Sequence, residues 1–404
     1  MSTTHAPFAQ RMNSLQKSFI REILKVTENQ HVISFAGGLP NPDFFPAAEM
    51  AEVTHELLQR EGAQVLQYST SEGYLPLREW IAQHYQQRDG LDIHADDILI
   101  LNGSQQGLDL IGKVFLNPQD VALVERPGYL GAIQAFSFYQ PRFVGVPLEQ
   151  DGVDIAALKA GLAHNPKLFY TVPTFQNPSG ITYSAEKRHR VAELLGDHPT
   201  ILVEDDPYNE LRFMGEDLLP LRYYRPNNTI LLGSFSKMVA PGLRLGWLCA
   251  AKPILEKLII AKQAADLHSN YLAQRVVHRY LQHYDLEAHL QKIRAAYGQQ
   301  RRLMVSLIEQ YFPPEVEYTR PEGGMFLWVT LPSHLSAMDL FELATKHQVA
   351  FVPGQAFYVD GGGHNTLRLN FSNASEAKIE EGIKRLAQAI KQLLHEQKNS
   401  VATV

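Results

Sequence analysis

The sequence is poor in cysteine, with Cys249 the single example among 404 residues. One thiol excludes an intrachain disulfide and a thiolate-rich metal site, and it fits a reducing compartment. The sequence also has no run of eighteen apolar residues, which is the length that a transmembrane helix needs. The first 30 residues lack the continuous apolar core of a secretory signal. We therefore expect a cytoplasmic protein that binds no metal and does not span a membrane.

An excess of positive charge is also missing. The 37 Lys and Arg residues against 43 Asp and Glu residues give a formal net charge of −6. Because proteins that bind nucleic acids usually carry a basic surface, we expect no nucleic-acid partner. The apolar content of 45% and the charged content of 20% are typical of a globular protein with a large core.

Short apolar runs alternate with helical stretches in the middle of the chain. Ile98–Leu101 is followed by a predicted helix over Ser104–Phe115, and the alternation continues through Ile201–Val203 and Thr229–Leu232. This pattern predicts βαβ units, and hence an α/β fold with a mostly parallel sheet covered on both faces. Ligands of such sheets bind at the edge where the strands have their C-terminal ends.

The rest of the chain has a different pattern. Helical sequence dominates from residue 252 to residue 311, and strands and helices then follow without strict alternation, which is typical of a smaller α+β domain. We predict a large domain over residues 46–300 and a small C-terminal domain over residues 301–404. Residues 1–45 form an N-terminal arm and part of the small domain, which is therefore discontinuous in sequence.

Two strand ends carry residues that suit the binding of ions. The segment Asn102-Gly-Ser-Gln-Gln106 offers free backbone N–H groups at the positive end of a predicted helix, which favours an anion such as phosphate. It matches neither a Walker loop nor Gly-x-Gly-x-x-Gly, and the alternative is that Ser104 is an ordinary helix cap. At the second end, Asp205 is placed to hold a cation; the alternative is a solvated turn beside Asp206-Pro207.

Lys237 follows an apolar strand in the segment Ser234-Phe-Ser-Lys237, and Arg244 comes seven residues later. A lysine at a buried strand end loses its proton readily and becomes a nucleophile toward carbonyl groups. The two serines and the arginine suit a phosphate. The alternative is a surface lysine beside a turn, which the small and apolar flanking residues disfavour.

Arg368 alternates with two leucines in the predicted strand Thr366–Phe371, so it lies on the opposite strand face from them. The guanidinium suits a carboxylate if that face borders the cleft, and the alternative is a solvated strand arginine. The four sites together provide an anion cradle, a nucleophilic lysine, an acid that pairs with a cation, and a carboxylate clamp. Pyridoxal phosphate catalysis has these requirements, because the acid keeps the pyridine nitrogen protonated and the ring then withdraws electrons.

With these motifs in this order, the sequence resembles the class I/II aminotransferases, which have fold type I among pyridoxal phosphate enzymes. The resemblance runs from about residue 34 to the C-terminus. Its most specific part is residues 234–246, which contain Lys237. The supporting motifs are Tyr68-Ser-Thr-Ser-Glu-Gly73, Asn102–Gln106, Arg126-Pro-Gly-Tyr129, Pro173-Thr-Phe-Gln-Asn-Pro-Ser-Gly180, Asp205–Tyr208 and Arg368. The resemblance implies a large mostly parallel-sheet domain and a smaller discontinuous α+β domain.

The resemblance also implies roles in binding pyridoxal 5'-phosphate. Lys237 forms the Schiff base and later moves the proton of the substrate α-carbon, while Asp205 pairs with the pyridinium nitrogen. Asn177 and Tyr208 hydrogen-bond the ring oxygen, and Tyr129 stacks on the ring. The phosphate group is held by Ser104, Gln105, Ser234, Ser236 and Arg244.

The substrate side of the site is implied in the same way. Arg368 binds the substrate α-carboxylate, with help from Asn177 and the Gly38 backbone. Tyr68 reaches the phosphate of a neighbouring subunit, which implies a homodimer with shared active sites. From the residues alone, the two tyrosines Tyr68 and Tyr129 also fit ordinary core or rim positions, and Asn177 before a proline also fits a simple turn.

The opening segment Phe35–Pro46, together with Tyr129, resembles the aminoadipate, kynurenine and aromatic aminotransferases. In that subgroup an arginine on a mobile N-terminal helix binds a distal carboxylate and moves away for apolar side chains. Arg21 in Ser18-Phe-Ile-Arg21 matches that position, and the alternative is a solvated helix arginine.

The resulting prediction is an enzyme that transfers the amino group of an L-amino acid to 2-oxoglutarate by a ping-pong mechanism. A lyase or decarboxylase on the same scaffold is the alternative. A regulator with an aminotransferase-like domain is disfavoured, because the 33 residues before Ser34 are too few for a winged helix-turn-helix module.

Overall fold

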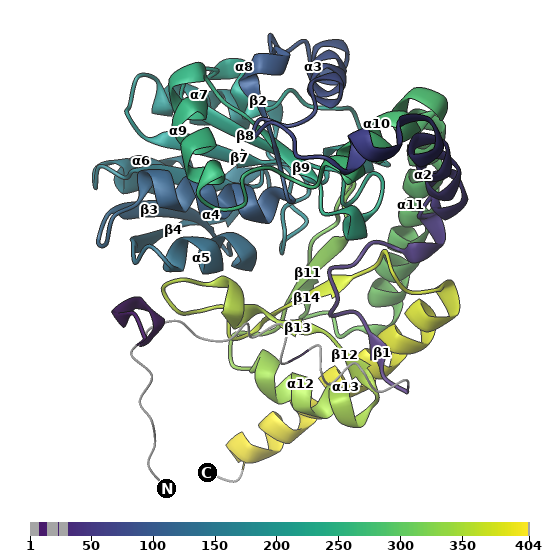
Figure 1. Ribbon diagram of the computed structural model, residues 1–404. Helices are drawn as coiled ribbons and strands as arrows, with labels where there is room; N and C mark the ends of the chain where they lie inside the picture. The colour runs from purple at the N-terminus through teal and green to yellow at the C-terminus, as the bar shows by residue number, and fades with distance from the viewer. Residues whose placement is uncertain (1–7, 14–22, 24–30, 403–404) are drawn as a thin grey trace, which may run out of the picture.

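The computed structural model of the chain describes residues 8–13, 23 and 31–402. Its largest sheet has eight strands in the order β2-β9-β8-β7-β6-β3-β4-β5 (Figure 1). The strands are β2 (Ile98–Leu101), β3 (Val121–Arg126), β4 (Arg142–Glu149), β5 (Gly152–Val153), β6 (Leu168–Thr171), β7 (Ile201–Asp205), β8 (Thr229–Ser234) and β9 (Gly246–Cys249). The pairings from β8 to β4 are parallel, so the predicted mostly parallel sheet is confirmed.

Strand β9 is a central strand that the sequence pattern did not reveal. It lies between β2 and β8 and runs antiparallel to both of them. A run of four residues directly after a loop rich in glycine and proline is too short to show a period, and an antiparallel strand breaks the βαβ alternation. The edge strand β5 is likewise antiparallel to its neighbour β4.

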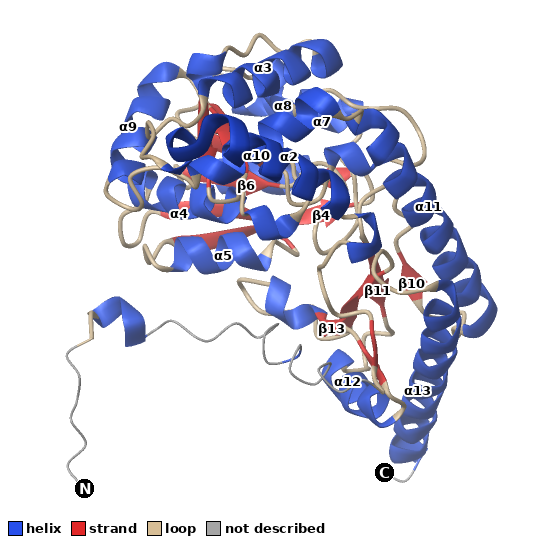
Figure 2. Cartoon of the chain, turned by 45° about the vertical axis from the view of Figure 1, so that its right-hand side comes forward, coloured by secondary structure: helices blue, strands red, loops and turns tan. Residues whose placement is uncertain are grey.

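Helices lie on both faces of this sheet (Figure 2). The reason is visible in β3, where Ala122 and Val124 pack into one hydrophobic cluster and Leu123 packs into another on the opposite face. We call this sheet and its helices the large lobe. Its helices are α2 (Ala47–Glu61), α3 (Leu75–Asp89), α4 (Ser104–Phe115), α5 (Leu130–Ser137), α6 (Ile155–Leu162), α7 (Ala185–Leu195), α8 (Leu221–Tyr224), α9 (Lys252–Gln263) and α10 (Tyr271–His283).

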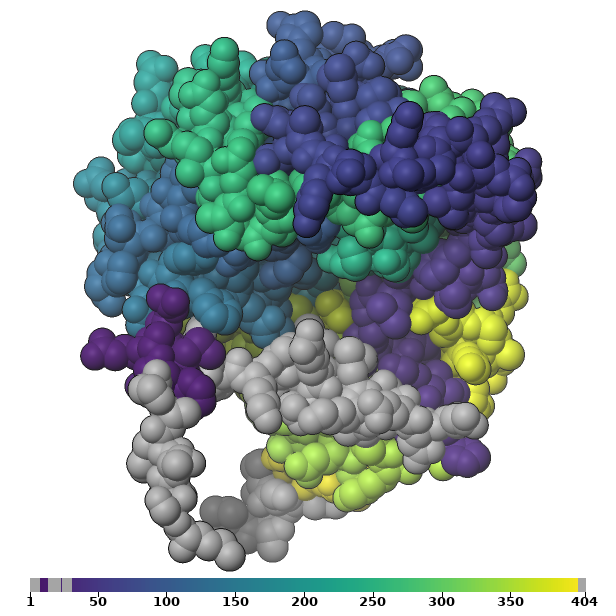
Figure 3. All heavy atoms as spheres, in the orientation of Figure 1, coloured from purple at the N-terminus to yellow at the C-terminus, as the bar shows by residue number. Residues whose placement is uncertain are grey.

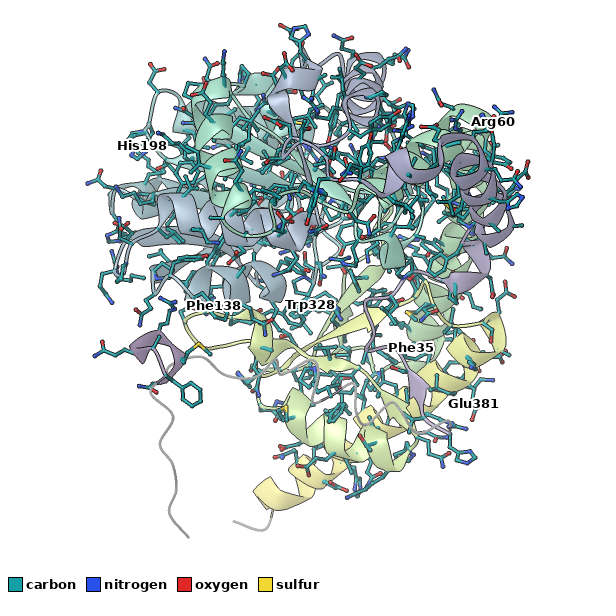
Figure 4. The ribbon with its side chains drawn as sticks, in the orientation of Figure 1. Phe35, Arg60, Phe138, His198, Trp328 and Glu381 are labelled. Carbon is teal, nitrogen blue, oxygen red and sulfur yellow. The ribbon has the colours of Figure 1, made fainter. Side chains whose placement is uncertain are left out.

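A second sheet has the order β10-β11-β14-β13, with antiparallel pairings. We call this sheet, with helices α12 and α13 and the two-stranded pairing of β1 with β12, the small lobe. Phe35 and Trp328 lie inside it (Figure 4). Its elements are β1 (Ile33–Ser34), β10 (Glu317–Tyr318), β11 (Phe326–Thr330), α12 (Ala337–Lys346), β12 (Val349–Ala350), β13 (Val352–Pro353), β14 (Thr366–Asn370) and α13 (Glu376–Ala402).

The helix α11 (Leu286–Tyr311) runs along one side of the molecule toward α13 (Figure 2). The predicted domain boundary at residue 300 lies inside this helix, and the division into residues 1–45, 46–300 and 301–404 stays a prediction. The arm at residues 33–35 hydrogen-bonds to the small lobe, where Phe35 N–H donates to the Ala350 carbonyl at 2.8 Å. In the space-filling view the C-terminal residues, drawn in yellow, lie below the large lobe (Figure 3).

Short 3-10 helices connect these elements: η1 (Gln10–Asn13), η2 (Pro42–Phe44), η3 (Gly62–Leu66), η4 (Ala95–Asp97), η5 (Asn209–Leu211), η6 (Pro241–Leu243) and η7 (Gly354–Phe357). Among the described residues, no helix combines the length and the apolar character that crossing a membrane requires.

Candidate active site

A cavity of about 380 Å³ lies where β2, β7 and β8 have their ends, with β14 of the small lobe on its other side. This is the sheet edge that the sequence pattern indicated. Of the predicted site residues that the structure describes, all but Tyr68 line it: Gly38, Ser104, Gln105, Tyr129, Asn177, Asp205, Tyr208, Ser234, Ser236, Lys237, Arg244 and Arg368. The fold therefore brings together residues from seven separate motifs of the chain.

Asp205 is the last residue of β7 and is 2% exposed. Its Oδ2 accepts a hydrogen bond of 2.7 Å from the Tyr170 hydroxyl, whereas its Oδ1 has no partner. Burial raises the pKa of Asp205 to about 7; the hydrogen bond from Tyr170 opposes this rise and the negative charge of Glu125 adds to it. The alternative of a solvated turn is wrong, and the free oxygen is ready for a cationic group.

Lys237 follows β8 and is half-buried, with its Nζ donating to the Gly38 carbonyl at 3.4 Å. Desolvation, with Arg244 and Arg368 nearby, lowers the pKa of Lys237 to about 8. The alternative of an ordinary surface lysine is wrong. A lysine with this pKa is partly neutral near pH 8, and the neutral amine is the nucleophilic form.

The anion cradle is built at the start of α4. Gly103, at φ +76°, is the N-cap of this helix, so Ser104 is its first residue and the alternative of Ser104 as the cap is wrong. A side chain at Gly103 would meet Arg244 Nη2 at 2.6 Å, which shows how closely the arginine approaches the loop. Arg244 Nη2 donates to the Asn102 carbonyl at 3.4 Å. The cradle therefore combines a helix N-terminus with a guanidinium.

The serines and the glutamine complete this side of the cavity. Ser234 ends β8, and its Oγ accepts a hydrogen bond of 3.1 Å from the Ser236 N–H. The Gln105 side chain donates to the Gly131 carbonyl at 2.9 Å and so connects the starts of α4 and α5. Their hydroxyl and amide groups surround the place where Arg244 and the helix end favour an anion.

Arg368 lies in β14 and is 2% exposed. Its Nη1 donates to Asn177 Oδ1 and its Nη2 to the Ala36 carbonyl, both at 2.8 Å, while its buried Nε has no partner. The guanidinium lies over the Phe326 ring at 4.4 Å. Desolvation lowers the pKa of Arg368 to about 10, and the alternative of a solvated strand arginine is wrong.

Three further predicted residues line the same cavity as Asp205 and Arg368. Asn177 Nδ2 donates to the Tyr208 hydroxyl at 3.4 Å, and both side chains are 5% exposed. Tyr129 precedes α5, and desolvation raises its pKa to about 12. Their proposed contacts with the cofactor ring stay predictions.

One described residue of the prediction lies elsewhere. Tyr68 is 78% exposed and contacts the His268 ring edge-on at 5.7 Å, outside the cavity. Arg21 lies outside the described residues. Tyr170, which hydrogen-bonds Asp205, is a residue of the site that was not predicted from the sequence. An aromatic residue in an apolar strand is typical of the core, so nothing in the sequence marked it.

Comparisons with known proteins agree with this geometry. The model of the family described as aminotransferase class I and II matches residues 31–386. The chain belongs to the class I and II aminotransferases. This aminotransferase is 43% identical over 392 residues to "Aromatic-amino-acid aminotransferase 1" of Thermococcus litoralis, covering 95% of this chain and 94% of the relative.

A second relative is the "2-aminoadipate transaminase" of Thermus thermophilus, 42% identical over 393 residues, with 96% of this chain and 97% of the relative covered. A similar solved structure is LysN, the α-aminoadipate aminotransferase of Thermus thermophilus, complexed with N-(5'-phosphopyridoxyl)-L-leucine. It has a TM-score of 0.89 and 41% sequence identity, and the match covers 96% of this chain and 98% of that one. The predicted family, fold and enzyme class are confirmed.

The aminotransferase depends on pyridoxal 5'-phosphate, as predicted. The residues present fit this cofactor. The unpartnered Oδ1 of buried Asp205 suits a protonated ring nitrogen, and the cradle at Ser104 and Arg244 suits the phosphate. Lys237, with its lowered pKa, suits the carbonyl carbon.

Proposed function

We propose that this enzyme transfers the amino group of an L-amino acid to 2-oxoglutarate by a ping-pong mechanism. The observation that carries the proposal is Arg368, a buried guanidinium with an unpartnered Nε in the same cavity as Lys237. Amino donor and 2-oxo acceptor both carry an α-carboxylate. Because one cavity and one such clamp serve both, the first product has to leave before the acceptor binds.

The cofactor, when bound, withdraws electrons from the substrate α-carbon. Asp205 supports this withdrawal by holding a proton on the ring nitrogen. Arg368 orients the substrate through its carboxylate, which keeps the α-carbon near Lys237. The Nζ of Lys237 then takes the α-proton, and its pKa of about 8 suits both taking and returning a proton near neutral pH.

The amino donor is proposed from the relatives. Their names indicate aromatic amino acids and 2-aminoadipate, so we propose these donors, with branched-chain amino acids as a third group. Assays of a donor panel with 2-oxoglutarate test this proposal. We expect glutamate to form in equal amount to the donor consumed. Release of ammonia or carbon dioxide without an acceptor would instead indicate the lyase or decarboxylase, which the family and relatives do not favour.

The essential role of Lys237 is tested by Lys237→Ala. We expect this variant to lose the yellow chromophore that borohydride reduces, and to lose glutamate formation by at least ~10³-fold. Lys257→Ala, an exposed lysine on α9, is the matched control and should behave as the wild type. A Lys237→Ala variant with normal turnover would overturn the proposal.

The proposed dual specificity of Arg21 follows from the resemblance, because this residue lies outside the described part of the chain. Arg21→Ala should impair acidic donors such as 2-aminoadipate more than aromatic or aliphatic donors. Equal losses for both classes would remove the special role of Arg21.

A homodimer and a cytoplasmic location complete the proposal. The exposed Tyr68 lies outside the cavity of its own chain, which supports a role toward a second subunit. The low cysteine content supports a reducing compartment.

A further inference from the structure

Glu125, in β3, is a carboxylate that is 1% exposed and lies outside the residues that line the cavity. Its Oε1 accepts hydrogen bonds from Thr171 Oγ1 at 2.6 Å, from the Tyr183 hydroxyl at 2.7 Å and from the Val172 N–H at 3.2 Å. Its Oε2 accepts from Gln176 Nε2 at 2.9 Å. Burial raises the pKa of Glu125, and the four hydrogen bonds oppose this rise, because all four partners are donors that the ionised carboxylate satisfies.

Gln176 links Glu125 to two further segments of the chain. Its Nε2 also donates to the Pro127 carbonyl at 2.8 Å. Its Oε1 accepts from both the N–H and the hydroxyl of Ser179, at 2.8 and 2.6 Å. Both hydrogens and both lone pairs of this amide are therefore used, and the side chain is fully buried. The orientation of the amide is fixed by Glu125, because a carboxylate accepts only from Nε2.

The two loops that Gln176 joins are those of the active site. One contains Asn177, the next residue, which accepts from Arg368 and donates to Tyr208. The other contains Pro127, two residues before Tyr129, whose ring lies in the cavity. One buried carboxylate is thus linked through one amide to both loops.

We propose that Glu125 is a positioning residue that acts through Gln176 to hold Asn177 and Tyr129 in the arrangement that binds the cofactor ring and the substrate carboxylate. This inference rests on the proposed roles of Asn177 and Tyr129. A glutamine at position 125 that keeps its carbonyl oxygen on the three donors of Oε1 would direct its NH₂ group at Gln176 Nε2. Gln176 then relieves the clash only by turning its amide over, which breaks its bonds to Ser179 and Pro127. The opposite orientation would direct the NH₂ group at the Val172 N–H, a backbone donor that cannot turn away.

The test compares Glu125→Gln, Gln176→Met and the double variant with the matched control Tyr183→Phe. The control removes a donor from Oε1 of the same carboxylate but leaves Gln176 untouched. Two kinds of quantity are measured besides thermal unfolding. The first is the KM and kcat with 2-aminoadipate as donor and 2-oxoglutarate as acceptor. The second is the dissociation constant of pyridoxal 5'-phosphate from the cofactor-free protein, followed by tryptophan fluorescence.

Glu125→Gln and Gln176→Met should each raise the KM and the cofactor dissociation constant about tenfold, with a smaller change in kcat. The double variant should be no worse than the more impaired single variant, since both substitutions cut the same link. Tyr183→Phe should lower the unfolding temperature but leave both constants within about twofold.

A Glu125→Gln variant that behaves as Tyr183→Phe does, or effects that add in the double variant, would overturn this inference. If Glu125→Gln does not fold, Gln176→Met against Tyr183→Phe decides the question with the same outcomes. A wild-type protein without the reducible chromophore would instead overturn the proposed function, so the two failures are distinguishable.

Discussion

Burial shifts the pKa values of three ionisable side chains in the cavity toward their neutral forms. The pKa of Asp205 rises to about 7, that of Lys237 falls to about 8 and that of Arg368 falls to about 10. Buried charges in proteins are usually paired with one another, but these three residues face a common cavity. The cost of desolvating them is offset when a ligand of complementary charge binds, which is typical of a functional site.

The acid Asp205 predicts a pH dependence of stability in the cofactor-free protein. Its pKa is raised from 3.8 to about 7, so the folded state holds a proton that the unfolded state has lost between these values. The contribution of Asp205 to the free energy of unfolding therefore falls as the pH rises from about 4 to 7, and it stays low above pH 7. Asp205→Asn removes the cost of burying an ionised carboxylate at this position. We expect Asp205→Asn to raise the unfolding temperature by roughly 2–5 °C at pH 8 and by less at pH 5.

Differential scanning calorimetry of the cofactor-free proteins at both pH values checks this expectation. Asp206, whose pKa is also raised, is present in both proteins, so the comparison isolates Asp205. A gain that is equal at pH 5 and pH 8 would contradict the explanation. With the cofactor bound, Asp205→Asn should instead lower the unfolding temperature, because the neutral Asn side chain cannot form an ion pair with a protonated ring nitrogen.

Arg368→Lys tests the carboxylate clamp. An ammonium group has no planar fork, so it cannot hold Asn177, Ala36 and a substrate carboxylate at once. We expect the KM for the amino donor to rise by about 10- to 100-fold, while the chromophore stays. The exposed Arg320→Lys is the control and should leave steady-state kinetics unchanged. An unchanged KM in Arg368→Lys would remove the clamp from the proposal.

At the scale of elements, the antiparallel strand β9 places its first residue against the anion cradle. A Cβ at Gly246 would lie 2.8 Å from the Gly233 carbonyl oxygen and 2.9 Å from the Ser104 nitrogen, both backbone atoms. Gly246→Ala should therefore destabilise the protein by about 1–3 kcal/mol and weaken cofactor binding, because the start of α4 has to move. Gly242→Ala, in the short helix η6 with open space around its Cβ position, should change neither.

Denaturant unfolding measures the stability of the two glycine variants, and cofactor titration measures their affinity for pyridoxal 5'-phosphate. Gly246→Ala with normal cofactor affinity would show that the cradle adapts without moving the start of α4.

The same elements show how far sequence reasoning reaches. The strand Ile98–Leu101 and the helix Ser104–Phe115 match the prediction residue for residue. The strand is a continuous apolar run, the helix has a clear apolar period, and Asn102 and Gly103 mark the turn between them. The motif residues converge on one cavity because parallel strands share one C-terminal edge. By contrast, the position of β9 in the sheet and the hydrogen bond of Tyr170 to Asp205 depend on tertiary contacts. A local sequence period does not indicate such contacts.

The burial of Arg368 also could not be predicted from the sequence and is seen only in the fold. Alternation in β14 separates its two faces, but both faces of this strand are covered, so the whole of β14 is buried. Glu125 and Gln176 are an ordinary acid and an ordinary amide in the sequence, and only the structure shows the hydrogen bond that joins them.

At the scale of the whole molecule, the proposed dimer predicts a role for Tyr68 that can be tested. Its exposed hydroxyl has to reach the phosphate of a second subunit. Tyr68→Phe should weaken cofactor binding about threefold to tenfold without changing the mass of the particle, since it removes one hydrogen bond. Light scattering and cofactor titration check both parts. A monomeric wild type, or a Tyr68→Phe variant with unchanged affinity, would contradict the shared site.

The order of the motifs also governs the order in which a growing chain acquires them. Every strand of the eight-stranded sheet, together with Asp205, Lys237 and Arg244, has been made once synthesis passes Cys249. Arg368 follows roughly ten seconds later at ordinary rates of translation. A ribosome therefore completes the proposed cofactor-binding residues of the large lobe before it adds Arg368, the proposed clamp for the substrate carboxylate.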